Sequence, residues 1–268
     1  MIKIAGADDL KKIVVINPKG GCGKTTLAIN LASSYALRGF QPTIIDCDPH
    51  GYCIRWLEKR PAERPLCYGI EGHGSHPRQP LEVPADSRIV IVDLPSALPV
   101  EALHAFTHLA DRILLPITPS AIDVFSASRF VAELMLDVQL DRSEQKLAIV
   151  ANRVKARTLS FDMLQRFLTS LSIPMIATLR DSQVYVHAAA RGLGISELPA
   201  SLVRSDLAQM SAIMHWLDRR RSGSTRVRNE TLTAKEQGHD DSHQQQRRIP
   251  EVEPNCEEAG QQQARDAD

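Results

Sequence analysis

Short apolar runs alternate with amphipathic segments along most of the chain. The runs are rich in Ile, Val and Leu without strict alternation, which is typical of parallel strands buried on both faces. The strands predicted in this way are Ile13–Ile16, Thr43–Ile45, Ile89–Val92, Ile113–Pro116, Leu147–Val150 and Met175–Ala177. Strands that alternate with helical patterns predict an α/β fold, with a mostly parallel, doubly wound sheet covered by helices on both faces.

The segments between these runs repeat their apolar positions every three to four residues, as amphipathic helices do. The predicted helices are Thr25–Leu37, Gly51–Lys59, Val100–His108, Asp123–Leu140, Phe161–Leu171, Gln183–Arg191 and Ser201–Arg219. In the fourth of them, Phe130, Leu134 and Val138 fall four residues apart. They form one apolar stripe, so we expect that face of the helix to be buried.

The composition changes in two places along the chain. Arg60–Pro84 is rich in Pro and Gly and predicts a loop, or a short edge strand around Leu66–Ile70. No aromatic residue follows Trp216, and Ser222–Asp268 is polar, with two Gln triplets. Such a segment cannot bury enough apolar surface to offset its ordering entropy. We therefore expect a folded domain over residues 1–220 and a disordered polar tail over residues 221–268.

The charge balance and the cysteines limit the binding partners and the cellular compartment that we expect for the protein. The 268 residues include 32 basic and 32 acidic side chains, so any nucleic-acid or membrane surface must be local. No apolar run approaches the roughly 18 residues of a membrane span, and the N-terminus lacks the apolar core of a signal peptide. The five cysteines are scattered and form no Cys-x-x-Cys pair. We therefore expect a cytoplasmic protein without a disulfide framework or a thiolate metal centre.

A glycine-rich stretch stands between the first predicted strand and the first predicted helix. It reads Lys-Gly-Gly-Cys-Gly-Lys-Thr-Thr from Lys19 to Thr26. In this context the glycines bend the backbone around an anion, and the helix that follows adds the positive end of its dipole. Lys24 would reach the β- and γ-phosphates of ATP, and the Thr25 hydroxyl would hold Mg²⁺. The residues expected to bind the nucleotide here are Gly20, Gly21, Cys22, Gly23, Lys24, Thr25 and Thr26.

Three segments in order resemble the ParA/MinD family of P-loop ATPases. The second lysine of the glycine loop, Lys19, matches the deviant Walker A motif of that family. Ile44–Gly51 resembles its Asp-x-Asp-Pro-Gln segment, with His50 where Gln is usual. Ile89–Ser96 resembles its Walker B strand and switch II, with Ser96 in place of a second proline. The resemblance implies a P-loop NTPase fold and an Mg²⁺-dependent ATP hydrolase with weak intrinsic activity.

The resemblance also implies roles for individual side chains. Lys19 would cross to the nucleotide of a partner subunit in an ATP-sandwich dimer, and Asp48 would position or activate the hydrolytic water. Asp93 would hold Mg²⁺ through water, with Asp46 nearby in switch I, and Asn152 would bind the adenine edge. The implied catalytic residues are thus Lys19, Lys24 and Asp48, and the implied metal residues are Thr25, Asp46 and Asp93. From the residues alone, Asp46 can equally be a structural carboxylate at a strand end, and Asn152 can cap a turn.

Arginines gather towards the end of the predicted domain. Five of the ten residues from Arg219 to Arg228 are arginine, and none is acidic. The candidate DNA-binding residues are Arg191, Arg204, Arg219, Arg220 and Arg221. Arginines on a dimer surface would bind DNA phosphates without sequence preference. The alternative is a solvated helix end, where basic residues are favoured by the helix dipole.

These features predict a ParA-like ATPase that dimerises on ATP, binds nucleoid DNA and positions or segregates a plasmid, a chromosome or a protein cargo. A ParB-like or cargo-adaptor protein would stimulate hydrolysis. One alternative is an ATP-switched docking scaffold without DNA binding. The other is a MinD-like membrane ATPase, but the polar tail lacks the apolar face of a membrane-targeting helix. We therefore expect no membrane partner.

Overall fold

The computed structural model describes residues 3–73, 80–136, 138, 140, 145–155, 158–171 and 173–219. The predicted tail over residues 221–268 lies outside this part of the chain, and so do Arg220 and Arg221. A seven-stranded sheet with strand order β4-β3-β6-β2-β7-β8-β9 forms the centre, and its neighbouring strands are all parallel. The strands are β2 (Lys11–Val15), β3 (Thr43–Asp46), β4 (Tyr68–Glu71), β6 (Ile89–Asp93), β7 (Arg112–Ile117), β8 (Leu147–Val154) and β9 (Met175–Arg180).

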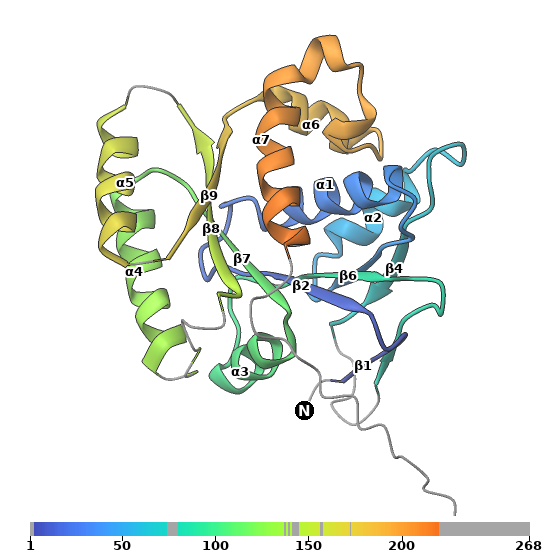
Figure 1. Ribbon diagram of the computed structural model, residues 1–268, viewed down its shortest axis with the longest axis horizontal. Helices are drawn as coiled ribbons and strands as arrows, with labels where there is room; N and C mark the ends of the chain where they lie inside the picture. Colours follow the sequence, from blue (N-terminus) through green and yellow to red (C-terminus); the bar gives the residue numbers. More distant parts are fainter. Residues whose placement is uncertain are drawn as a thin grey trace, which may run out of the picture. The chain divides into compact units, whose positions relative to one another are not determined.

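Helices cover both faces of this sheet (Figure 1), which confirms the predicted fold class. One face carries α1 (Lys24–Leu37), α2 (Tyr52–Glu58), α6 (Gln183–Ala190) and α7 (Ala200–Asp218), and the other carries α3 (Val100–Leu109), α4 (Ala121–Leu136) and α5 (Leu159–Leu171). Ile13 and Val15 of β2 pack in the apolar cluster of α1, whereas Val14 packs in the cluster of α3 and α4. Alternate side chains of one strand thus enter two cores, so the strand is apolar throughout.

The fourth predicted helix ends earlier than its apolar stripe suggested. Helix α4 stops at Leu136, and the amides of Val138 and Leu140 instead donate to the carbonyls of Glu133 and Leu134. These wide turns close the helix, yet Val138 and Leu140 remain buried in the core. The stripe correctly predicted burial but not the end of the helix, because the same spacing continues through the closing turns.

Two short strands were not predicted. Strands β1 (Ile4–Ala5) and β5 (Leu81–Glu82) form a separate two-stranded parallel sheet. Two residues are too few to show a period of two, so the sequence carried no signal for them. The edge strand expected around Leu66–Ile70 is present as β4, which begins at Tyr68.

The order of the strands places a crevice at one edge of the sheet. From β2 the chain runs outward to β3 and β4 and returns to β6 on one side, and it then crosses to β7 on the other side of β2. The carboxyl ends of parallel strands share one edge, and ligands bind where the strand order reverses in this way. The glycine loop leaves β2 at this point. Within the described residues, no helix combines the length and the apolar character that crossing a membrane requires.

Candidate functional site

The glycine loop has the backbone conformation that the motif predicted. Gly21 and Gly23 have φ angles of 77° and 94°, a region that favours glycine, and α1 begins directly afterwards at Lys24. A Cβ atom on Gly23 would lie 2.2 Å from the Asn152 side-chain nitrogen, so the position also lacks space for one. No side chain caps the start of α1. The first amides of this helix are therefore available to an anion, as in a phosphate-binding loop.

Lys24 is held against the loop to which it belongs. Only 7% of the residue is exposed, and its ammonium donates to the Ser96 hydroxyl at 2.9 Å and to the Lys19 carbonyl at 3.3 Å. Ser96 therefore has a specific contact at the position where the family more often has proline. These contacts place the positive charge of Lys24 beside the glycine loop, where it can bind a phosphate.

Thr25 and Asp93 meet at the base of the loop, as a magnesium site requires. The Thr25 hydroxyl donates to Asp93 Oδ2 at 2.7 Å, and the other oxygen of Asp93 is buried without a hydrogen-bond partner. Burial raises the pKa of Asp93 to about 6, and the charge of Asp46 adds to this, although Thr25 and Cys53 donate to the carboxylate. A cation at this point would compensate the buried charge. Hydroxyl and carboxylate oxygens are the ligands that Mg²⁺ prefers, so these residues fit the ion.

Asp46 lies next to Asp93 because β3 and β6 are neighbouring parallel strands in register. One of its oxygens accepts the amide of Cys53 at 2.8 Å, and the other accepts the amide of Asp48 at 3.1 Å. Asp46, Cys53 and Asp93 bring their ligand atoms within 4.8 Å of one another. Asp46 therefore orients the start of α2, and its predicted metal role remains a prediction. Cys53 belongs to this cluster although no sequence motif assigned it a role.

Asp48 lies on the loop that follows β3 and is partly exposed. Its Oδ1 accepts the His50 amide at 2.9 Å and contacts His50 Nδ1 at 2.7 Å, and the His50 ring stacks on Tyr52. Burial acts to raise the pKa of Asp48, but the hydrogen bonds from His50 outweigh it and the pKa lies below the usual value. The carboxylate is thus an anion that can accept a hydrogen bond from a water molecule. His50, the departure from the family pattern, supports Asp48 directly.

A β-bulge turns Asn152 towards the glycine loop. Between Ala151 and Val154 the register of β8 against β9 shifts, and Arg153 takes a φ of 53°. The Asn152 side chain donates to the Cys22 carbonyl at 2.7 Å and is buried. Asn152 therefore holds the glycine loop in place from β8. A pocket of about 200 Å³ lies beside it, lined partly by Leu27, Leu179, Tyr185 and Met210, and could hold a nucleobase.

Cys22 packs beside the loop. It is 2% exposed, and burial raises the pKa of its thiol despite the nearby charge of Lys24. The side chain is therefore a neutral, enclosed thiol, and its carbonyl rather than its sulfur contributes to the site through Asn152.

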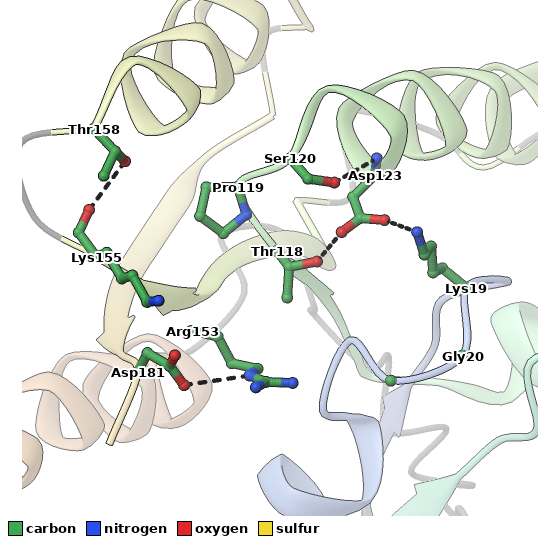
Figure 2. Close-up of a pocket in the computed structure, with 11 residues that line it drawn as sticks. Lys19, Gly20, Thr118, Pro119, Ser120, Asp123, Arg153, Lys155, Thr158 and Asp181 are labelled. Carbon is green, nitrogen blue, oxygen red and sulfur yellow. Dashed lines mark hydrogen bonds and ion pairs between the residues drawn. The ribbon is translucent and has the colours of Figure 1, made fainter. Parts of the chain in front are cut away.

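An open pocket of about 480 Å³ lies in front of the glycine loop (Figure 2). It is lined by Lys19, Gly20, Gly21, Thr118, Pro119, Ser120, Asp123, Arg153, Lys155, Thr158 and Asp181. The Lys19 ammonium forms an ion pair with Asp123 at the start of α4, and Arg153 pairs with Asp181 at 3.3 Å. No sequence motif assigned a role to Asp123 or Arg153. An acid in a first helical turn is common, and the bulge that exposes Arg153 leaves no mark in the composition.

The predicted DNA-binding arginines lie on exposed segments where the structure describes them. Arg191 follows the end of α6, Arg204 lies in α7, and Arg219 follows α7. Arg180, by contrast, is committed to a bidentate pair with the fully buried Asp206 at 2.6 and 2.8 Å. The exposure of Arg191, Arg204 and Arg219 is compatible with a phosphate-binding surface. Their role in DNA binding stays a prediction.

Comparison with known proteins agrees with this geometry. Residues 13–195 match a family model described as the CobQ/CobB/MinD/ParA nucleotide binding domain. The "Maintenance of carboxysome distribution protein A" of Gloeobacter kilaueensis is 30% identical, over 77% of this chain and 94% of that protein. The protein of the same name from Halothiobacillus neapolitanus is 27% identical, over 70% of this chain and 88% of its own length. A Cyanothece McdA variant solved with ATP shares the fold, with a TM-score of 0.57 and 16% identity over 81% of this chain and 99% of that one.

Proposed function

This chain belongs to the CobQ/CobB/MinD/ParA nucleotide-binding family, and from that premise we propose that it is a ParA-like, Mg²⁺-dependent ATPase that works as an ATP-sandwich dimer. In this proposal the dimer binds DNA without sequence preference and positions or segregates a cargo. A ParB-like or cargo-adaptor protein stimulates hydrolysis and thereby releases the dimer. The protein is then cytoplasmic and associates with the nucleoid when ATP is bound.

The observation that carries the proposal is the different surroundings of the two lysines on one loop. Lys24 contacts the Lys19 carbonyl and Ser96 and is almost fully buried. The Lys19 side chain instead points towards Asp123 at the open pocket (Figure 2), and 36% of it is exposed. A glycine loop that serves only the nucleotide of its own subunit needs Lys24 but has no need of a second lysine at position 19. The arrangement therefore supports a role for Lys19 towards a second subunit.

The described residues can supply each part of phosphoryl transfer. Lys24 and the amides at the start of α1 would bind the phosphates, and Thr25 with Asp93 would hold Mg²⁺, which supplies positive charge to the leaving and transferred groups. Asp48, ionised and anchored by His50, would orient the attacking water. Lys19 of one subunit would add charge at the phosphates of the other, which makes full engagement depend on dimerisation.

The relatives indicate the kind of cargo. Two proteins that match most of this chain are named for carboxysome distribution, and shorter matches are to chromosome-partitioning proteins. A protein assembly is therefore the cargo that we favour within the proposal. The partner that stimulates hydrolysis would then be an adaptor on the surface of that assembly.

The dimer is tested by analytical ultracentrifugation of the full chain with ATP, a non-hydrolysable analogue, ADP and no nucleotide. We expect a dimer only with ATP or the analogue in the presence of Mg²⁺. Lys19→Ala should remain monomeric, whereas the control Lys59→Ala, at the exposed end of α2, should dimerise like the wild type. A Lys19→Ala protein that dimerises normally would refute the role in trans.

DNA binding is tested separately by measuring retention on non-specific duplex DNA at several salt concentrations. We expect binding in the ATP state alone, with an affinity that falls steeply as salt rises. Substituting Arg191 and Arg204 together should weaken it, whereas Arg166→Ala, on the exposed side of α5, should not. Equal retention with ATP and ADP would contradict the switch, and an ATP dimer with no retention would favour the scaffold.

A further inference from the structure

The ion pair between Lys19 and Asp123 joins a movable group to a fixed one. The Asp123 side chain is 11% exposed, and that of Lys19 is 36% exposed. Asp123 also accepts the Thr118 hydroxyl, and its amide donates to the Ser120 hydroxyl at 3.1 Å (Figure 2). Two contacts besides the ion pair thus hold Asp123 in place, and the long Lys19 side chain is the partner that can leave.

Asp123 carries a full negative charge at this position. Burial acts to raise its pKa, but hydrogen bonds from Lys19, Thr118 and Ser120 outweigh burial and lower it. An ionised, partly buried carboxylate attracts an ammonium more strongly than an exposed one, because less water screens the pair.

The Asp123 carboxylate lies beside the proposed nucleotide site. Asp123 lines the same pocket as Lys19, Gly20 and Gly21, so it faces the loop that would hold the phosphates. An ammonium bound to Asp123 lies within its own chain. To reach a phosphate in a second chain, Lys19 must exchange the carboxylate for that phosphate.

We propose that Asp123 is a positioning residue for Lys19: it holds the lysine within its own subunit and thereby sets the ATP concentration at which two subunits join. This inference rests on the proposed function, since it assumes that Lys19 acts on a second subunit. The Thr118 hydroxyl holds the carboxylate, the Ser120 hydroxyl holds the Asp123 backbone amide, and the γ-phosphate competes with the carboxylate for the ammonium. The ion pair makes dimerisation less favourable. A nucleotide that binds weakly or lacks the γ-phosphate therefore does not trigger dimerisation.

The test measures the ATP concentration for half-maximal dimerisation, with a hydrolysis-resistant analogue, in four full-length proteins. These are the wild type, Asp123→Asn, Asp123→Glu and the control Glu133→Gln, which removes the same charge about 15 Å further along α4. We expect Asp123→Asn to lower the concentration about fivefold. Asp123→Glu should restore it towards the wild type, and Glu133→Gln should leave it unchanged.

A second measurement separates an effect through Lys19 from direct repulsion of the phosphates. ATP affinity is compared between Lys19→Ala and the double variant Lys19→Ala, Asp123→Asn. That difference reports the direct effect alone, and we expect it to be smaller than the shift in dimerisation. Raising the salt concentration should also reduce the gap between the wild type and Asp123→Asn, because salt screens the ion pair.

The possible failures are distinguishable. If the wild type dimerises on ATP but Asp123→Asn needs the same or a higher concentration, the positioning role is wrong and the proposed function stands. An equal shift in ATP affinity in the Lys19→Ala background would also overturn it. If the wild type does not dimerise on ATP at all, both the proposed function and this inference fail.

Discussion

Two ion pairs in this molecule are built from similar charges and have opposite surroundings. Arg60 and Glu197 form a bidentate pair at 2.6 and 2.8 Å, with side chains that are 6% and 0% exposed. Arg60 also donates to the Pro65 and Gly192 carbonyls, and Glu197 accepts the Gly194 amide. Lys19 and Asp123 form a single contact at the mouth of an open pocket.

The difference lies in how many other contacts depend on each pair. Arg60 follows α2, and Glu197 belongs to η2 (Ile195–Glu197), so their pair joins segments that are far apart in the sequence. Every polar atom of this network has a partner, and removing one group leaves a buried charge. Lys19 is partly exposed, and when it moves the Asp123 carboxylate keeps the hydrogen bond from the Thr118 hydroxyl. One pair therefore holds the fold, and the other is free to change partners.

The largest effect is expected from breaking the buried pair. Glu197→Ala should lower the free energy of unfolding by about 3–5 kcal/mol, because the Arg60 charge stays buried without a partner. Glu197→Gln keeps an acceptor for the Gly194 amide and should cost less. Urea titration followed by circular dichroism measures both. A loss below about 1 kcal/mol for Glu197→Ala would show that water reaches Arg60 and that the two pairs do not differ.

An intermediate effect of opposite sign is expected at Asp93, a buried charge that forms no ion pair among the described residues. Its pKa is about 6 in the fold and close to 3.8 in the unfolded chain, so the folded state binds the proton more tightly. Ionisation then costs stability as pH rises from about 4 to 6, and the full cost is present above pH 6. Asp93→Asn should therefore stabilise the Mg²⁺-free protein by about 1–3 kcal/mol at pH 8, and the gain should shrink as pH falls towards 4.

Chemical denaturation of the Mg²⁺-free wild type and Asp93→Asn at pH 8, 6 and 4.5 checks this expectation. Asp162→Asn, in the exposed first turn of α5, serves as the control for loss of a carboxylate. A gain that is the same at all three pH values would show that the pKa of Asp93 is not raised. A loss of stability at pH 8 would show that the Thr25 hydrogen bond outweighs the buried charge.

The smallest effect is expected at the open pair. Asp123→Asn should change the free energy of unfolding by less than about 1 kcal/mol, because Lys19 can move into water and Asn can still accept the Thr118 hydroxyl. Thermal unfolding of this variant beside Glu197→Ala gives the direct comparison. If Asp123→Asn unfolds as readily as Glu197→Ala, the Lys19–Asp123 pair is structural and the contrast between the two pairs is wrong.

Much of the site followed from short motifs in the sequence. The Lys19–Thr26 loop was predicted from its own glycines and lysines, and roles for Asp48 and Asp93 came from the resemblance to the ParA/MinD family. Parallel strands explain why these residues lie together, since every such strand ends at the same edge of the sheet and delivers its next residue to one crevice. Asp46 and Asp93, 47 positions apart, become neighbours through the register of β3 and β6.

Other parts of the site had no readable signal. Asn152 was expected to bind adenine, and its contact with the Cys22 carbonyl arises from a bulge in β8 that shifts the strand register. Ser96 was noted only as a departure from a family pattern, but its hydroxyl accepts a hydrogen bond from the Lys24 ammonium. Cys53 approaches Asp93 because α2 begins over the end of β6. Each contact joins residues whose separation along the chain carries no periodic pattern.

The sequence by itself determined the kind of protein: a parallel α/β domain, a phosphate loop and a second lysine on that loop. These depend on local properties, namely apolar runs, glycine at positions of positive φ, and a strand that leads directly into a helix. The tertiary structure alone decided what the second lysine contacts. Lys19 and Asp123 lie on segments separated by several strands and helices, and only the packing of α4 beside the loop brings a fixed carboxylate within reach of a mobile ammonium.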